Sequence, residues 1–126
     1  MNREEKYLVI DDISGRVPHG VVFNTDWGNK TLTGIQYDNV NTLLYFGVCN
    51  STNKVIETYV SEVKPYLFPI SSMTKEQKNA IDLIASSSST VLSDVVDFYN
   101  KNHIDYRGLI PKGLALDATG LNIYLK

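Results

Sequence analysis

Hydrophobic and polar positions change period along the chain, and the first pattern predicts a helix. Asn2 and Glu5 have the spacing of a capping box, and apolar residues then recur at three- and four-residue steps. We expect a short helix that ends near Arg16, because Pro and Gly in residues 17–20 stop it. A strand over residues 7–10 is the alternative, since Tyr-Leu-Val-Ile has strong strand propensity.

The second pattern, over residues 21–60, predicts an antiparallel sheet. Apolar and β-branched runs are spaced about ten residues apart and separated by polar turns, as in a meander or a small open barrel. We therefore predict four strands. They cover residues 21–23, 31–37, 42–48 and 54–60, with turns at 26–29, 38–39 and 50–53.

The third pattern is helical and begins after an extended connector. Two prolines in residues 63–69 predict a stiff, largely extended connector. Thr74 and Gln77 form a second capping box, which opens a helix through residue 85. The serine run 86–89 separates it from a third helix, whose apolar residues share one face from Val91 to Tyr99.

The last part of the chain follows neither helical nor strand periodicity. Residues 102–116 mix His, Asp, Arg, Lys, Gly and Pro with apolar residues, which indicates a segment held by tertiary contacts. Residues 114–116 and 121–124 are expected to form a terminal hairpin. The whole pattern predicts one α+β domain over residues 1–126, mainly β up to residue 62 and mainly helical from residue 70.

Composition limits the classes of protein that this chain can belong to. Its 126 residues suit a single domain, and 43% hydrophobic residues argue against disorder. A net charge of −2 disfavours bulk affinity for nucleic acid. Apolar runs are too short for a membrane span, and the single Cys49 rules out an internal disulfide. We expect a cytoplasmic protein, in the host cytoplasm if it is encoded by a phage.

Motifs for catalysis, metals and cofactors are lacking. Cys49 has no histidine placed beside it by the sequence, so a buried or strand-end thiol is the favoured interpretation. The chain contains no Gly-x-Ser-x-Gly, no zinc-ligand spacing and no phosphate-binding glycine loop after a strand. We therefore predict no metal site, no catalytic residue and no cofactor.

His103, Asp105 and Arg107 form the sharpest polar cluster. In a functional interpretation, Asp105 orients His103 and Arg107 binds an anionic group, with Tyr106 and Lys112 nearby. In a structural interpretation, His103 sits at the negative end of a helix and an Asp–Arg pair locks a loop. We favour the structural interpretation, because paired charges are also common in purely structural networks.

Aromatic residues of the predicted sheet offer a second candidate surface. Trp27, Tyr37, Tyr45 and Phe46 would stack nucleic-acid bases if they shared an exposed face. Few basic residues lie among them, so packing within the fold is the favoured interpretation. Trp27 stands apart, because an Asp-Trp-Gly-Asn turn can expose a large aromatic as an anchor for a partner. Packing of Trp27 back onto the core is the alternative.

Two distinctive segments are Lys-Pro-Tyr-Leu-x-Pro at residues 64–69 and Asp-Tyr-Arg-Gly-Leu-Ile-x-Lys-Gly-Leu-Ala at 105–115. They resemble segments of a group of small uncharacterised proteins encoded in phages, prophages and mobile elements of gut anaerobes. An Arg-Val-Pro-His-Gly-Val segment at 16–21 is similar to an early segment of that group. The chain departs from the pattern at His19, Phe68 and Pro111, where Tyr, Arg and Glu are expected, and the Phe68 change removes one anion contact. The resemblance implies a phage-like origin and no particular reaction.

Three hypotheses for function follow. The first is a non-catalytic interaction module that binds a phage or host protein and interferes with a host process. The second is a nucleic-acid-binding protein that uses an aromatic sheet face. The third is a small enzyme or nucleotide-binding protein that uses His103, Asp105 and Arg107. Charge balance and the missing motifs favour the first hypothesis.

Overall fold

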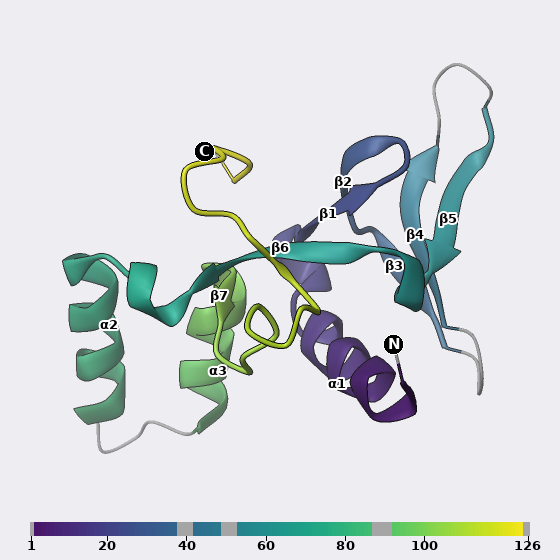
Figure 1. Ribbon diagram of the computed structural model, residues 1–126. Helices are drawn as coiled ribbons and strands as arrows, with labels where there is room; N and C mark the ends of the chain where they lie inside the picture. Colours follow the sequence, from purple (N-terminus) through teal and green to yellow (C-terminus); the bar gives the residue numbers. More distant parts are fainter. Residues whose placement is uncertain (1, 38–41, 49–52, 87–91, 125–126) are drawn as a thin grey trace.

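A computed structural model describes residues 2–37, 42–48, 53–86 and 92–124, and its fold is α+β (Figure 1). The α-helices are α1 (Arg3–Ser14), α2 (Lys75–Ser86) and α3 (Leu92–Lys101). The strands are β1 (Val22–Thr25), β2 (Gly28–Thr31), β3 (Gly34–Gln36), β4 (Leu43–Val48), β5 (Val55–Tyr59), β6 (Lys64–Pro69), β7 (Ile104–Asp105) and β8 (Leu116–Asp117). Short 3₁₀ turns η1, η2 and η3 cover Val17–His19, Val60–Glu62 and Ile70–Ser72.

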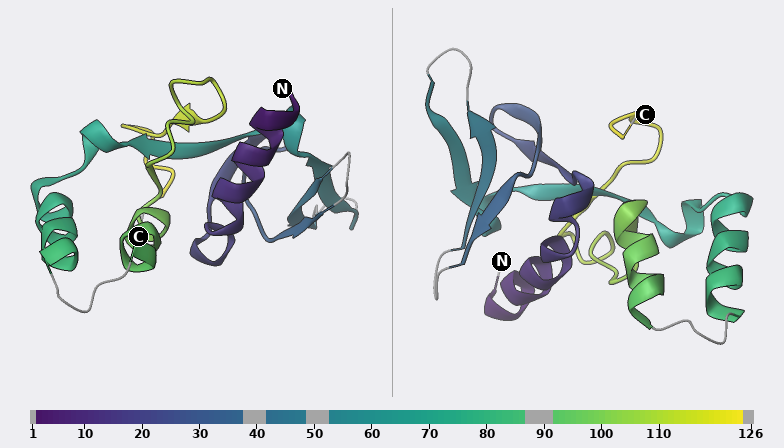
Figure 2. Two further views of the ribbon diagram at one scale, coloured as in Figure 1. Left: turned by 90° about the horizontal axis from the view of Figure 1, so that it is seen from below. Right: turned by 180° about the vertical axis from the view of Figure 1, so that it is seen from behind.

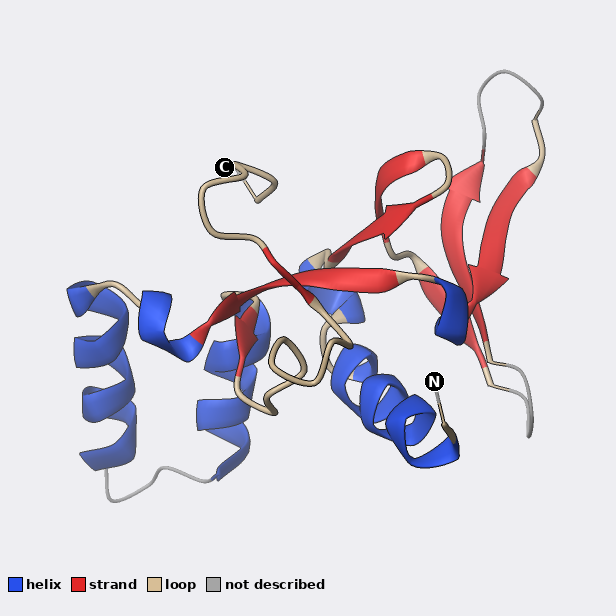
Figure 3. Ribbon diagram, in the orientation of Figure 1, coloured by secondary structure: helices blue, strands red, loops and turns tan. Residues whose placement is uncertain are grey.

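Strand β6 connects the two ends of the molecule. It lies in a sheet of order β2-β1-β6-β7, pairs antiparallel with β1, and pairs in parallel with both β7 and β8. Strands β3, β4 and β5 form a separate antiparallel sheet. Figures 2 and 3 show this second sheet at one end of β6 and the helices α2 and α3 at the other.

The predicted four-stranded sheet over residues 21–60 is wrong, because the second predicted strand divides between the two sheets. Leu32 N–H donates to the Val21 carbonyl at 2.9 Å, whereas Thr33 N–H donates to the Tyr45 carbonyl at 2.8 Å. The chain therefore leaves one sheet and enters the other within two residues. Leu32 is buried at this junction, and its burial in the core favours the break.

The proline-containing connector is extended, as predicted, but it is also a strand of the first sheet, which was predicted to end at residue 60. Pro65 is buried and lies opposite Phe23 of β1, and Pro69 ends β6 opposite Asp105. Proline has a backbone angle compatible with extended structure but removes one ladder donor. The residues between the prolines keep their backbone N–H groups as hydrogen-bond donors. The Phe68 N–H, for example, donates to the His103 carbonyl at 2.8 Å.

Helix α1 confirms the amino-terminal prediction and provides one wall of the core. Asn2 Oδ1 accepts from Glu5 N–H at 2.8 Å, and Glu5 Oε1 accepts from Asn2 N–H at 3.0 Å, so the capping box is complete. Val9 and Ile13 are fully buried on its inner face. They join a cluster that contains Val21, Phe23, Leu32, Leu44, Phe46, Ile56, Val60, Val63, Leu67, Leu109, Leu114 and Ala115.

Helices α2 and α3 confirm the two later helices. Thr74 and Gln77 exchange capping bonds of 2.9 and 3.1 Å at the start of α2. The two helices lie side by side in opposite directions (Figure 1). Some predictions lie outside the described residues: the Cys49 environment, Val91, and most of the serine run and of the turns after β3 and β4.

The predicted terminal hairpin is wrong, because the end of the chain bonds to the first sheet. β8 pairs with β6, and the Tyr124 hydroxyl accepts from Val22 N–H at 2.8 Å and donates to the Tyr66 carbonyl at 2.6 Å. Val22 and Tyr66 would be the next pair of the β1–β6 ladder after Phe23 and Pro65. The Tyr124 side chain therefore bridges the two strands where their direct ladder ends.

Burial of this phenol predicts a pH dependence of stability. Loss of hydration raises the pKa of Tyr124 to about 12, above the value near 10 of an unfolded tyrosine. The folded state favours the protonated phenol, so its contribution is complete below about pH 10 and is lost as the pH rises to about 12. Relative to Tyr124→Phe, the natural chain should lose roughly 2 kcal/mol of unfolding free energy across this window.

Urea unfolding of both proteins at pH values on either side of pH 10 measures this difference. Lysines and other tyrosines titrate in the same range, but they are shared by the two proteins, so the difference isolates Tyr124. Below pH 10, Tyr124→Phe should be the less stable protein by about 1–3 kcal/mol, because Val22 N–H loses its acceptor. Stability curves that stay parallel up to pH 12 would show that the phenol is hydrated.

Candidate functional site

A buried ion pair lies beneath the polar segment that follows α3. Asp12 and Arg16 are both 0% exposed, four residues apart at the end of α1. Arg16 Nε donates to Asp12 Oδ2 at 2.8 Å and Nη2 donates to Oδ1 at 3.1 Å. This bidentate geometry is the strongest form of a carboxylate–guanidinium contact.

The same guanidinium joins α1 to β7 and to its neighbours. Arg16 Nη2 also donates to the Ile104 carbonyl at 2.6 Å. The Tyr106 ring lies 5.5 Å from the guanidinium carbon, and Tyr99 of α3 stacks on Tyr106 at 5.2 Å. The buried charge therefore joins the end of α1 to residues 99–106, which are far away in the sequence.

Arg107 covers this buried pair. Its Nε lies 3.5 Å from Asp12 Oδ1 and donates to the Tyr106 hydroxyl at 3.2 Å. The guanidinium also lies over the Tyr106 ring at 5.2 Å, and one third of the side chain is exposed. Arg107 and Tyr106 are thus engaged within the fold.

Asp105 is a buried acceptor for backbone amides. Its Oδ1 accepts from Leu109 N–H at 2.8 Å and its Oδ2 accepts from Ile110 N–H at 2.9 Å. Both carboxylate oxygens therefore hold the turn that brings Leu109 into the core. The contacts of Asp105 differ from those of the functional interpretation, in which it orients His103.

His103 contacts the carboxyl-terminal segment of the chain. It follows α3 with a φ of 59°, in the left-handed region, and its ring stacks on Tyr124 with centroids 3.7 Å apart. The other two candidates lie elsewhere. Lys112 is exposed in the loop after Leu109, and Trp27 is 48% exposed at the tip of the β1–β2 hairpin.

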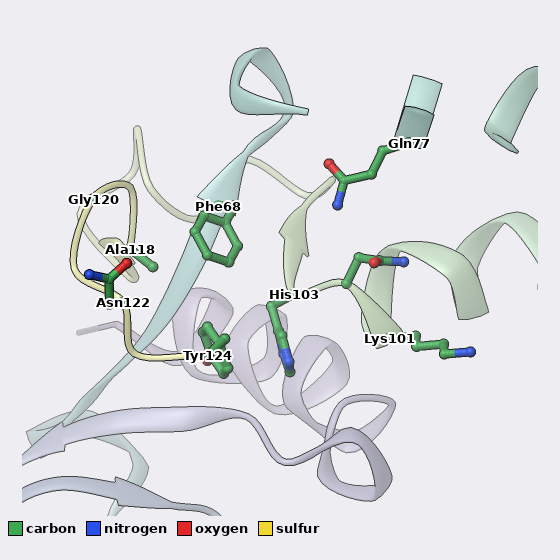
Figure 4. A pocket seen from close by; sticks show the side chains of 9 residues that line it. Phe68, Gln77, Lys101, His103, Ala118, Gly120, Asn122 and Tyr124 are labelled. Atoms are coloured by element: carbon green, nitrogen blue, oxygen red, sulfur yellow. The ribbon is translucent and has the colours of Figure 1, made fainter. Parts of the chain in front are cut away.

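A pocket of about 320 Å³ opens beside His103 (Figure 4). Its walls come from the end of β6, the start of α2, the end of α3 and the carboxyl-terminal segment. The lining residues are Phe68, Gln77, Lys101, Asn102, His103, Ala118, Gly120, Asn122 and Tyr124. This lining includes a lysine and a histidine but no Asp or Glu, although the chain as a whole has a net charge of −2.

Two features of the site were missed by sequence reasoning. The Asp12–Arg16 pair had a signal, because residues four apart face each other on a helix and one was predicted there. Nothing in the sequence identified Tyr124 as a pocket residue, because its position depends on where the chain crosses β1 and β6.

No protein-family model, curated protein sequence or solved structure matches this chain. Within the described ranges, no helix combines the length and apolar character needed to cross a membrane. The same residues contain no group of three or more His, Cys, Asp or Glu side chains arranged to hold a metal ion.

Removal of Asp12 should be strongly destabilising. Asp12→Ala leaves the fully buried Arg16 without its counter-charge, which typically costs about 3–5 kcal/mol. Chemical denaturation measures this loss, and Asp11→Ala is the matched control because Asp11 is exposed on the same helix. The double change Asp12→Leu with Arg16→Met should cost less than Asp12→Ala alone, since it removes both buried charges. Equal losses for Asp11→Ala and Asp12→Ala would refute the structural role of the pair.

Proposed function

We propose that this protein is a non-catalytic interaction module whose pocket holds an acidic segment of a phage or host protein. The observation that carries the proposal is the charge of the pocket lining, which contains Lys101 and His103 but no carboxylate. The phage or host setting follows from the sequence resemblance. Interference with a host process is the expected consequence of such binding.

The pocket suits an anionic group next to an apolar one. Lys101 is an exposed lining residue whose side chain extends away from His103 and Tyr124, and Asn122 adds an amide (Figure 4). Charge-assisted hydrogen bonds from such donors to a carboxylate are stronger than neutral ones. Phe68 and Tyr124, with centroids 5.8 Å apart, supply an aromatic wall for a neighbouring apolar side chain.

Binding is favoured over catalysis because the polar groups with catalytic chemistry have structural partners. Asp105 accepts two backbone amides, and Arg107 pairs with Asp12 and Tyr106. A general base must reach the proton that it abstracts, and a buried carboxylate that holds a turn is poorly placed for this. The enzyme hypothesis therefore lacks two of its three residues.

Nucleic-acid binding through stacked aromatics is disfavoured because those residues do not share one exposed face. Phe46 is buried and packs edge-on against Phe23 at 5.4 Å. Trp27 belongs to the other sheet, and the Tyr37 hydroxyl lies 2.6 Å from Ser14 Oγ at the end of α1. The Tyr45 hydroxyl donates a hydrogen bond to Gln36 Oε1 within the sheet of β3, β4 and β5. Single-strand binders instead stack successive bases along one groove.

Reversal of the pocket charge tests the proposal. Tagged natural protein and Lys101→Glu should be compared for capture of proteins from infected and uninfected host lysates. A partner that uses the pocket should be captured at least about tenfold less by Lys101→Glu, because an attractive charge becomes repulsive. Capture by the natural protein should also fall as salt is raised.

Lys112→Glu is the matched control, since Lys112 is an exposed lysine that does not line the pocket. It should capture the partner as well as the natural protein does. Circular dichroism of both variants checks that they are folded. Undiminished capture by Lys101→Glu, or an equal loss for both lysine variants, would contradict the proposed role of the pocket.

A further inference from the structure

Strand β5 is an edge of the second sheet. The order of that sheet is β3-β4-β5, and among the described residues no segment pairs with the other side of β5. Figures 1 and 2 show β5 as the outermost strand of this sheet, beyond β4. An edge strand has backbone donors and acceptors that a further strand can use.

The register identifies which backbone groups of β5 point outward. Val60 N–H donates to the Thr42 carbonyl at 3.0 Å, and Glu57 lies three positions before Val60, opposite Tyr45. Because ladder bonds occur at every second residue of an antiparallel pair, Glu57 does not bond β4. The Tyr45 carbonyl agrees with this, since it accepts from Thr33 N–H on the β3 side at 2.8 Å. The N–H and the carbonyl of Glu57 are therefore directed away from β4, toward the open edge.

The side chains that alternate with the core-facing ones give this edge a distinct pattern. Val55 and Tyr59 are 56% and 43% exposed, and Glu57 lies exposed between them, whereas Ile56 belongs to the core cluster. Among the residues that make up β3, β4 and β5, all of them described, Glu57 is the only charged one. The edge thus presents one carboxylate between two apolar side chains, each two residues away.

We propose that β5 binds an extended, basic segment of another protein, which adds a fourth strand to the second sheet. This segment has a lysine or arginine opposite Glu57 and an apolar residue two positions to either side, opposite Val55 and Tyr59. Opposite charges, and apolar residues that face aromatic or β-branched ones, are favourable pairs across two strands. The backbone N–H and carbonyl of Glu57 bond the residue that faces them.

The charge of Glu57 argues against a second copy of this chain as the occupant. Val55, Glu57 and Tyr59 of two copies all pair only in the antiparallel register that is centred on Glu57. In that register the two Glu57 carboxylates lie directly opposite each other, and like charges so placed are destabilising. The edge is therefore complementary to a basic strand and not to itself.

This surface is separate from that of the proposed function, because the pocket lining includes no residue of β3, β4 or β5. Either proposal can therefore fail while the other stands.

Binding of two peptides to the full chain tests the proposal. The first is acetylated and amidated Thr-Val-Thr-Lys-Thr-Val-Thr, and the second has glutamate in place of the central lysine. Titrations followed by the amide NMR signals of the protein measure both affinities. The dissociation constant of the lysine peptide should be lower by about fivefold or more, because glutamate opposite Glu57 replaces attraction by repulsion. The Glu57 amide should also exchange more slowly with solvent when the lysine peptide is bound.

Substitutions at Glu57 separate the two contributions. Glu57→Lys should reverse the order of the two peptides. Glu57→Pro removes the outward N–H but no ladder bond to β4, and it should weaken the lysine peptide by about fivefold or more. Asn29→Pro is the matched control, because Asn29 has an equivalent outward position on β2, the edge strand of the first sheet. It should bind the lysine peptide as the natural chain does.

Equal affinities of the natural chain for the two peptides would overturn the proposal, and so would the absence of binding at millimolar peptide. Equal weakening by Asn29→Pro and Glu57→Pro would show that the peptide does not use β5. A dimer of the natural chain that Glu57→Pro abolishes would identify a second copy as the occupant instead. If Glu57→Pro loses the circular dichroism of the folded chain, the order of the peptides on Glu57→Lys decides the question.

Discussion

Burial of the Arg16 guanidinium is the constraint on which the arrangement of this fold depends. A charge that is fully removed from water must be compensated, and here Asp12 provides two contacts and the Ile104 carbonyl provides a third. Those partners come from α1 and β7, which are separated by most of the chain. Placing Arg16 therefore also places the segment after α3, and with it the turn held by Asp105.

A second constraint acts along β6. Its backbone bonds are shared among β1, β7 and β8, so the central strand receives segments from both halves of the sequence. Where the ladder to β1 ends, the Tyr124 hydroxyl takes the place of a direct backbone bond. The same side chain stacks on His103 and lines the pocket. Tyr124 therefore contributes both to the link between β1 and β6 and to the lining of the pocket.

Polar residues of the chain thus divide into an internal and an external group. Asp12, Arg16, Asp105 and Arg107 hold elements together, whereas Lys101 and the charges of α2 and α3 face solvent. The internal group explains why a cluster that resembles a catalytic site has structural contacts. The external group includes Lys101, on which the proposed recognition of an acidic partner rests.

Local signals in the sequence were sufficient for the three helices, the capping boxes of the first two and the α+β class, because helix periodicity and caps involve residues close in the chain. They also indicated that residues 102–116 are held by tertiary contacts, and Leu109 and Leu114 are indeed in the core. The division of the strands into two sheets, the role of β6 and the position of Tyr124 were decided only in three dimensions. Pairing between distant strands depends on which backbone groups meet after the core has formed. The spacing of prolines and the alternation of apolar residues therefore do not identify the partner of a strand.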